Sequence, residues 1–292
     1  EDANYEKKCA GIITWMHTFS PSKMWIRGLV KLQKPYLHLH TQFNREIPNE
    51  GIDMDFMNLN QSAHGDREHG FIGARLRLAR KVVVGYWEDE AVQQKMAAWM
   101  RVALGVMDSR RLKIARFSDN MRDVAVTEGD KVEAQVRLGW SVNTYPVGEL
   151  VTYIDAVKDA EIDAMMKTYE DKYTMDTENI ASVRYQAKLE AAMQKFLEKG
   201  GFEGFVNHFD DLYGMEQLPG LAVQDLTAQG YGFGPEGDWK VAALARVMKA
   251  MAQGDDKGTA LMEDYTYNFA PNGESLILGA HMLEVCPSVA AG

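Results

Sequence analysis

The sequence contains little cysteine, no excess of positive charge and no long apolar run. Its 292 residues include two cysteines, Cys9 and Cys286, which form neither a C-x-x-C pair nor a disulfide framework. This usage is typical of the reducing cytoplasm. A formal net charge of -10 disfavours nucleic-acid binding, which normally requires a basic face. No apolar run is long enough to span a bilayer, and no secretory signal stands at the start. We therefore expect a cytoplasmic protein without nucleic-acid or membrane partners.

Several motifs that mark common enzyme classes are also absent. The chain has no G-x-G-x-x-G and no G-x-x-x-x-G-K-[ST], so neither a dinucleotide nor a nucleoside triphosphate is indicated. It has no G-x-S-x-G elbow, and neither cysteine lies in the setting expected of a nucleophile. These absences disfavour redox enzymes, kinases and hydrolases that use a serine or cysteine nucleophile.

Strand-like and helix-like segments alternate along the first third of the chain. The predicted strands cover residues 9–16, 35–41, 81–87 and 112–117, and the predicted helices cover residues 20–32, 68–80 and 89–103. Alternation of strand and helix is typical of a parallel sheet. We therefore predict an α/β domain at residues 1–111.

The pattern restarts near residue 112. A turn at residues 128–130 separates two short apolar runs, a charged helical stretch covers 149–199 before Gly200 and Gly201, and helical periodicity covers 221–252. After Gly258 two strands are joined by a turn at 270–273. The predicted fold class is α/β: two Rossmann-like parallel-sheet domains, at 1–111 and 112–258, followed at 259–292 by the start of a β-rich, antiparallel, barrel-like domain.

Two glutamates and one histidine in the last third of the chain suggest a metal site. Glu236 lies in a tight G-P-E-G loop before a helix, Glu263 precedes Y-T-Y, and His281 follows an apolar strand. Carboxylate and imidazole donors suit Mn²⁺, Mg²⁺ or Fe²⁺ better than the thiolate sets of structural zinc. Each residue also has a simpler explanation. Glu236 would be an exposed turn residue beside an Asp238 helix cap, Glu263 part of a buried ion pair, and His281 a hydrogen-bonded core residue.

Other histidines give weaker signals. His38 and His40 alternate with leucines, so both imidazoles should face one side of a strand. Such a pair can bind a metal, as in a zinc hydrolase, but no third ligand accompanies it locally. A solvated strand face is the commoner outcome. His64, in a polar loop ahead of a helix, would either contact substrate or cap that helix.

Long segments of the chain resemble the bacterial L-arabinose isomerase family, and the resemblance covers the whole chain. They include W-M-H-T-F-S-P-S-K-M-W-I-R-G-L, M-N-L-N-Q-S-A-H-G, R-F-S-D-N-M-R-D-V-A-V-T-E-G-D-K-V, Q-L-P-G-L-A-V-Q, P-E-G-D-W-K and M-E-D-Y-T-Y. The resemblance implies one Mn²⁺ per site, held by Glu236, Glu263 and His281. It also implies that Glu236 and Glu263 act as general acid and base, moving a proton between two sugar carbons through an ene-diol.

The resemblance further implies a substrate site and an assembly. The expected reactions convert L-arabinose to L-ribulose and D-galactose to D-tagatose, as part of arabinose catabolism. Gln61 and His64 would reach the site of a neighbouring subunit in a trimer-based oligomer, expected to be a homohexamer. Val206 stands where relatives often have Thr, which leaves the preference between the two sugars open. An apolar wall around the sugar would be formed by Phe19, Met121, Phe209, Tyr265 and Met282.

The ends of the sequence support an alternative. The first residue is not methionine, and the resemblance implies a fourth metal ligand, a C-terminal histidine, and an N-terminal segment that this sequence does not contain. The alternative is a truncated, catalytically incomplete isomerase fragment, or a non-catalytic α/β sugar-binding module. Completion of the metal coordination sphere distinguishes these alternatives from an active isomerase.

Overall fold

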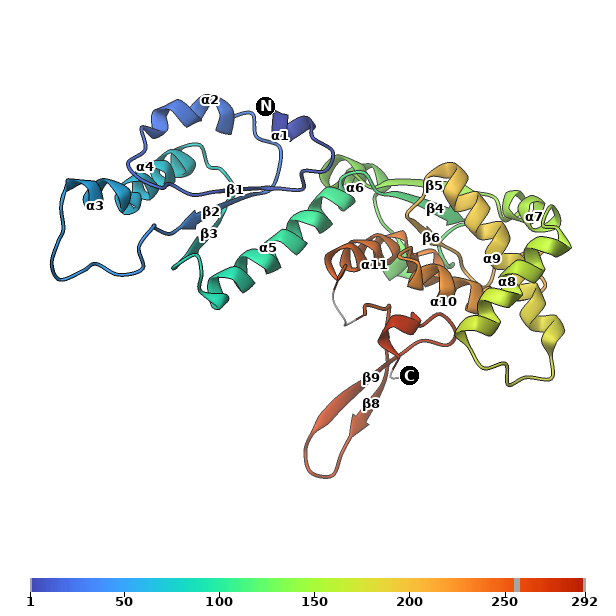
Figure 1. The fold of residues 1–292 in the computed structure, drawn as a ribbon. Helices are drawn as coiled ribbons and strands as arrows, with labels where there is room; N and C mark the ends of the chain where they lie inside the picture. The colour runs from blue at the N-terminus through green and yellow to red at the C-terminus, as the bar shows by residue number, and fades with distance from the viewer. Residues whose placement is uncertain (1, 255–257, 291–292) are drawn as a thin grey trace. The chain divides into compact units, whose positions relative to one another are not determined.

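The structure, a computed structural model, describes residues 2–254 and 258–290. The chain separates into two compact units, Glu1–Met107 and Asp108–Gly292. Each unit is built on a parallel sheet, and a small antiparallel hairpin follows in the second (Figure 1). The predicted α/β fold class is therefore confirmed. Within the described residues, no helix is both long and apolar enough to cross a membrane.

The first unit contains a three-stranded parallel sheet with the order β1-β2-β3. Its strands are β1 (Ile12–Thr14), β2 (Tyr36–His40) and β3 (Lys81–Val84), and its helices are α1 (Asp2–Tyr5), η1 (Ser22–Trp25), α2 (Ile26–Leu29), α3 (Met54–Leu59), α4 (Ser62–Arg75) and α5 (Glu90–Ser109). The strands predicted in this region are confirmed. The helix predicted at 68–80 is shifted towards the N-terminus, and the one predicted at 20–32 is split into two short turns.

The second unit contains a four-stranded parallel sheet with the order β5-β4-β6-β7. Its parallel strands are β4 (Lys113–Phe117), β5 (Ser141–Tyr145), β6 (Gly204–Val206) and β7 (Gly232–Gly234). The helices are α6 (Lys131–Leu138), α7 (Val147–Asp155), α8 (Asp159–Lys172), α9 (Ile180–Gly200), α10 (Gly220–Ala228) and α11 (Trp239–Met251), with short turns η2 (Ala125–Thr127), η3 (Pro235–Gly237) and η4 (Pro287–Val289). The strand predicted at 112–117 is thus central to this sheet and does not extend the first one.

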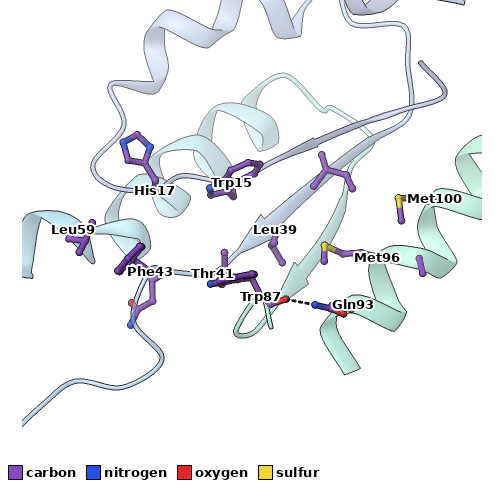
Figure 2. Close-up of a pocket in the computed structure, with 13 residues that line it drawn as sticks. Trp15, His17, Leu39, Thr41, Phe43, Leu59, Trp87, Gln93, Met96 and Met100 are labelled. Carbon is purple, nitrogen blue, oxygen red and sulfur yellow. Dashed lines mark hydrogen bonds between the residues drawn. The ribbon is translucent and has the colours of Figure 1, made fainter. Parts of the chain in front are cut away.

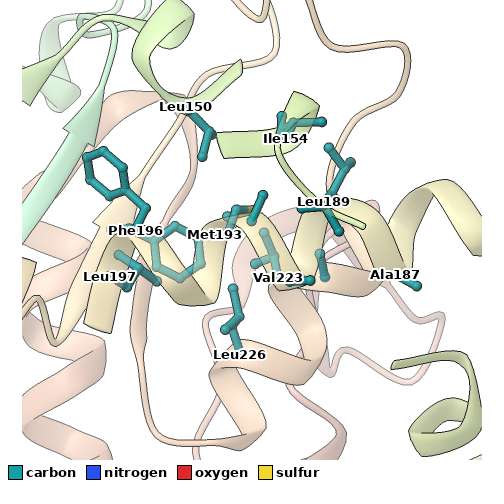
Figure 3. Close-up of a cluster of buried hydrophobic side chains, with 14 of the residues drawn as sticks. Leu150, Ile154, Ala187, Leu189, Met193, Phe196, Leu197, Val223 and Leu226 are labelled. Atoms are coloured by element: carbon teal, nitrogen blue, oxygen red, sulfur yellow. The ribbon is translucent and has the colours of Figure 1, made fainter. Parts of the chain in front are cut away.

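Alternate residues of β4 face two different cores. Ile114 packs in a cluster with Trp239 of α11, whereas Ala115 and Phe117 belong to a larger cluster with α7, α8, α9 and α10. Figure 3 shows the second cluster, with Phe196 and Met193 of α9 among its labelled members. Because side chains alternate along a strand, helices cover both faces of the sheet.

Three predictions in this unit were incomplete or wrong. Of the two apolar runs around residues 128–130, the first forms the short turn η2 and the second forms helix α6. The Asp130 carboxylate accepts hydrogen bonds from the N–H groups of Val132 and Glu133 and caps α6. The helical stretch at 149–199 is three helices, α7, α8 and α9, and Gly201 ends the last one at a φ of 63°. The helical stretch at 221–252 is interrupted by strand β7.

Two glycines of β7 explain that interruption. A Cβ atom on Gly232 would lie 2.1 Å from the carbonyl oxygen of Ala242, and one on Gly234 would lie 2.1 Å from that of Asp238. The backbone of α11 therefore packs directly against the strand, which only glycine permits. Sequence periodicity does not report such close approach of two backbones.

The two strands predicted after Gly258 form the hairpin β8 (Glu263–Phe269) and β9 (Ser275–Ala280). In its turn, the N–H of Gly273 donates to the oxygen of Ala270 at 3.0 Å. Large apolar side chains of the hairpin are exposed on both strands, among them Tyr267, Phe269, Leu276, Ile277 and Leu278.

A buried polar network joins α8, α9 and α10. Glu190 of α9 is fully buried and accepts hydrogen bonds from the Tyr169 hydroxyl and from Gln229 Nε2, the latter at 3.2 Å. Lys172 Nζ lies 2.5 Å from Asp225 Oδ1. Burial raises the pKa of Glu190 to about 8, and its hydrogen bond with Asp225 acts in the same direction. Although burial opposes it, the hydrogen bonds from Glu190 and Lys172 lower the pKa of Asp225.

The protonated Glu190 carboxyl makes the stability of the second unit depend on pH. The pKa of Glu190 in the folded state, about 8, lies above its ordinary value of 4.5. The stabilisation that protonated Glu190 gives the folded state is therefore fully present below pH 4.5, and it is lost as the pH rises through about 8. We expect the free energy of unfolding, measured by urea denaturation, to fall across this window by up to about 1.4 kcal/mol per pH unit.

The substitution Glu190→Gln should flatten this slope, because a neutral amide keeps the hydrogen bonds without titrating. Glu198→Gln, on an exposed residue of the same helix, is the matched control and should keep the wild-type slope. Equal slopes in Glu190→Gln and wild type would contradict the assignment.

Candidate functional site

The order of the second sheet points to the carboxyl ends of its strands. β4 is followed along the chain by β5 on one side, and β6 then joins β4 on the other side. Parallel sheets bind ligands outside their carboxyl ends, at the point where the strand order reverses. At this edge lie the segments 118–121 after β4, 207–211 after β6 and 235–238 after β7.

Backbone hydrogen bonds fasten these three segments to one another. The N–H of Met121 donates to the oxygen of Glu236 at 2.9 Å, and the N–H of Gly237 donates to the oxygen of Asn207 at 2.9 Å. The Ser118 hydroxyl also donates to the Asp211 carboxylate. Main-chain hydrogen bonds therefore fix the position of Glu236 against the segments that follow β4 and β6.

Glu236 has a strained backbone. Its φ of 57° lies in the left-handed region, as does the φ of 69° at Ser118 on the neighbouring segment. Non-glycine residues adopt this conformation at an energetic cost and are concentrated at functional sites. The adjoining helix begins as expected, because Asp238 accepts hydrogen bonds from the N–H groups of Lys240 and Val241. The predicted Asp238 cap is confirmed, and Glu236 itself is half-buried.

A buried arginine organises the segment after β4. The Arg116 guanidinium donates to Asn120 Oδ1 at 2.6 Å, to the Ser118 oxygen at 3.2 Å and to the Asp119 carboxylate. The backbone N–H of Asn120 and then Arg116 lower the pKa of Asp119.

The segment after β6 carries a buried histidine. His208 is 3% exposed, and its Nδ1 has no hydrogen-bond partner among the described residues.

Sequence reasoning missed Arg116, Ser118, Asp211 and His208. Their positions in the sequence could have indicated this edge of the sheet. Arg116 and Ser118 stand at the end of one predicted strand, and His208 follows a short apolar run. Of the residues predicted from the family resemblance, Met121, Phe209 and Glu236 all belong to this edge.

The hairpin carries the other predicted residues of this unit. Glu263 opposes Ala280 in the ladder, so Glu263 and His281 lie at the same end of the hairpin. Glu263 is exposed, so the buried ion pair considered for it is not observed. His281 is partly buried, and its Nδ1 lies 2.5 Å from Glu284 Oε2. Tyr265 and Met282 are exposed.

The donor atoms of Glu236, Glu263 and His281 are not gathered into one cluster. In residues 2–254 and 258–290, the group of three or more potential ligands with mutually close donor atoms is His38, His40 and Asp66. The shared metal role of the two glutamates and His281 therefore stays a prediction.

The first unit brings together Phe19, predicted for the apolar wall around the sugar, with Gln61 and His64, which were predicted to reach a neighbouring subunit's site. The rings of Phe19 and His64 lie 5.1 Å apart. His64 is in the first turn of α4, and Gln61 is the residue that directly precedes this helix. Phe19 is half-exposed, and His64 Nδ1 has no hydrogen-bond partner in the described part of the chain.

The solvated strand face predicted for His38 and His40 is wrong for His38. His38 is fully buried and lies 2.8 Å from Asp66 of α4, while His40 is half-buried. Helix α4 covers this face of the sheet, as expected when both faces of a parallel sheet are covered. Burial lowers the pKa of His40 and lowers that of the adjacent His69 to about 4.

A large apolar cavity of about 870 Å³ lies in the first unit. Figure 2 shows Trp15 and Leu39 from the strand region and Met96 and Met100 from α5 around it. None of the residues predicted for the sugar or metal site lines this cavity. The cavity is therefore separate from the chemistry predicted from the sequence.

The close approach at Gly237 gives a test of the segment that holds Glu236. A Cβ atom there would lie 2.5 Å from the oxygen of Asp119, and the φ of 78° also favours glycine. We expect Gly237→Ala to lower the free energy of unfolding by more than about 1 kcal/mol, measured by thermal or urea denaturation.

Gly148→Ala is the matched control, because nothing lies within 4 Å of a Cβ atom built there. It should be neutral or stabilising, since alanine favours the helix. Similar effects of both substitutions would show that the segment is not tightly constrained.

Comparison with known proteins assigns the family. Models of the L-arabinose isomerase N-terminal, central and C-terminal domains match residues 1–111, 113–254 and 258–292. The L-arabinose isomerases of Geobacillus kaustophilus and Anoxybacillus flavithermus are 60% and 62% identical to this chain over 296 residues. That of Thermotoga maritima is 60% identical over 292 residues. Each match covers 99% of this chain and 59% of the relative, so the chain spans about three fifths of their length. Because these matches cover nearly its whole length, the chain belongs to the L-arabinose isomerase family.

Proposed function

We propose that this chain provides the catalytic carboxylates of a metal-dependent aldose–ketose isomerase that converts L-arabinose to L-ribulose and D-galactose to D-tagatose. The observation that carries this proposal is the position of Glu236. In a chain of this family, its strained backbone is fixed at the carboxyl edge of the second sheet by hydrogen bonds with Met121 and through Gly237.

The chemical problem is the removal of a proton from a carbon next to a carbonyl group. Glu236 and Glu263 would act as general base and general acid, and transfer the proton between the first two sugar carbons through an ene-diol. When bound, a divalent cation, proposed to be Mn²⁺, would neutralise the negative charge that develops on the sugar oxygens.

The side chains of this chain fit such a cation in their chemistry. Glu236 and Glu263 offer carboxylate oxygens, and both are partly or fully accessible. His281 Nδ1 is paired with Glu284, which leaves Nε2 as the donor. Histidine ligands commonly hold their second ring nitrogen with a carboxylate in this way. Glu236, Glu263 and His281 are therefore the residues proposed to hold the metal.

The substrate would be enclosed by apolar side chains. Met121 and Phe209 lie on the same edge as Glu236, and Tyr265 and Met282 extend from the hairpin near Glu263 and His281. Phe19 would belong to the same apolar wall, and Gln61 and His64 would reach the site of a neighbouring copy in a trimer-based homohexamer. The free thiols of Cys9 and Cys286 suit the reducing cytoplasm in which we place the enzyme.

The proposal is tested by L-ribulose formation from L-arabinose with Mn²⁺, using this chain with its intact mass confirmed. The same assay is run on the chain extended to the length of its relatives. Glu236→Gln and Glu263→Gln should each lower turnover by about 10²- to 10⁴-fold, as expected for a lost acid or base. EDTA should abolish turnover, and isothermal titration should show weaker Mn²⁺ binding by both variants.

Glu274→Gln is the matched control, because Glu274 is an exposed glutamate in the turn of the same hairpin. It should retain wild-type turnover. Wild-type turnover in Glu236→Gln or Glu263→Gln, in the form of the chain that is active, would refute the proposed roles.

A further inference from the structure

A second group of potential metal ligands lies in the first unit, on residues that the proposed isomerase reaction does not use. His38 and His40 project from β2, and Asp66 projects from α4. Their donor atoms all lie within 4.8 Å of one another. We propose that His38, His40 and Asp66 form a site for Zn²⁺ or a similar borderline divalent ion, with one coordination position left open.

The two distances from the histidine donors to the Asp66 carboxylate bracket the value expected for a tetrahedral site. His38 Nε2 lies 2.8 Å from Asp66 Oδ1, and His40 Nδ1 lies 3.8 Å from Asp66 Oδ2. Zinc bonds of 2.0–2.1 Å place tetrahedral ligands about 3.3 Å apart, between these two values. His40 is half-buried, and its ring would have to turn to bring the three donors around one ion.

Hydrogen bonds behind the cluster fix the orientation of His38. Its Nδ1 lies 2.9 Å from the Thr14 hydroxyl, which lies 2.8 Å from the Tyr36 hydroxyl. The Tyr36 hydroxyl in turn contacts His69 Nε2. Occupation of Nδ1 by this chain of groups presents Nε2 to Asp66. Such outer partners are typical of histidines that bind metals.

The charge of Asp66 also favours a cation. The carboxylate is 4% exposed, and the ion-pair partners that the structure gives it are the two histidines. A buried carboxylate needs compensating charge, and a divalent ion held by the three side chains would supply it. Arg80 acts on His40 electrostatically and opposes a dication, so the expected affinity is moderate.

The donor set and its surroundings select the ion and its coordination. Two imidazoles and one carboxylate suit Zn²⁺ and Co²⁺ better than Mg²⁺ or Ca²⁺. His40 and Asp66 line a cavity of about 450 Å³ at the carboxyl ends of β2 and β3, together with Thr41, Gly85 and Tyr86. This cavity provides an entry path, and water or a small ligand fills the fourth position.

The test uses protein stripped of metal and carrying Glu236→Gln and Glu263→Gln, so that binding at the proposed isomerase ligands is removed. Isothermal titration with Zn²⁺ should give one ion per chain, and Co²⁺ should give the absorption of a tetrahedral site. Adding His40→Gln or Asp66→Asn should weaken Zn²⁺ binding by more than about 100-fold. Thr14→Val should weaken it by about 10- to 100-fold, as for other outer partners.

His17→Gln is the control, because His17 is an exposed histidine of the same unit and should not change binding. Circular dichroism of each variant without metal verifies folding, and the Thr14→Val result remains decisive if a ligand variant does not fold. The proposal would be overturned if the protein carrying only Glu236→Gln and Glu263→Gln did not bind Zn²⁺. It would also be overturned if adding His40→Gln, Asp66→Asn or Thr14→Val left Zn²⁺ binding unchanged. The isomerase proposal is unaffected by either result.

Discussion

The packing of α11 against β7 determines the shape of the candidate active-site edge. The strand contributes glycine at both contact positions, so the helix backbone approaches closely, and only a short segment remains between strand and helix. Glu236 lies in that segment and adopts a left-handed conformation. The segments after β4 and β6 then hold it through main-chain hydrogen bonds. A rigid scaffold that presents a strained polar residue from a short loop is typical of catalytic sites.

Both units of the chain use the carboxyl ends of parallel strands in a similar way. In the first unit, β2 ends at His40 beside Asp66, and in the second, β4, β6 and β7 lead into Ser118, His208 and Glu236. The amino ends of the same strands carry none of these residues. This asymmetry follows from the parallel arrangement of the strands, which places all the loops that leave their carboxyl ends along one edge of the sheet.

The sequence predicted the parallel α/β architecture and the hairpin, because apolar strands and turn residues are local signals. It did not reveal β7, since Gly-Phe-Gly lacks the β-branched residues typical of strands, or α6, whose start depends on the Asp130 cap. His38 was misjudged because its partner Asp66 is 28 residues away, and only the tertiary fold joins them. The roles predicted for Glu236 and Glu263 depend on long segments shared with a family, because the chemistry of these residues alone does not distinguish them from surface glutamates.

The hairpin of β8 and β9 affects how the polypeptide behaves in solution. It is a two-stranded ribbon with apolar side chains exposed on both strands, and each strand has a free edge with unpaired main-chain groups. Ribbons of this kind pair readily with other chains. We therefore expect this segment to lower the solubility of the isolated polypeptide, and charged substitutions at Ile277 or Leu278 to raise it while leaving the parallel sheets intact.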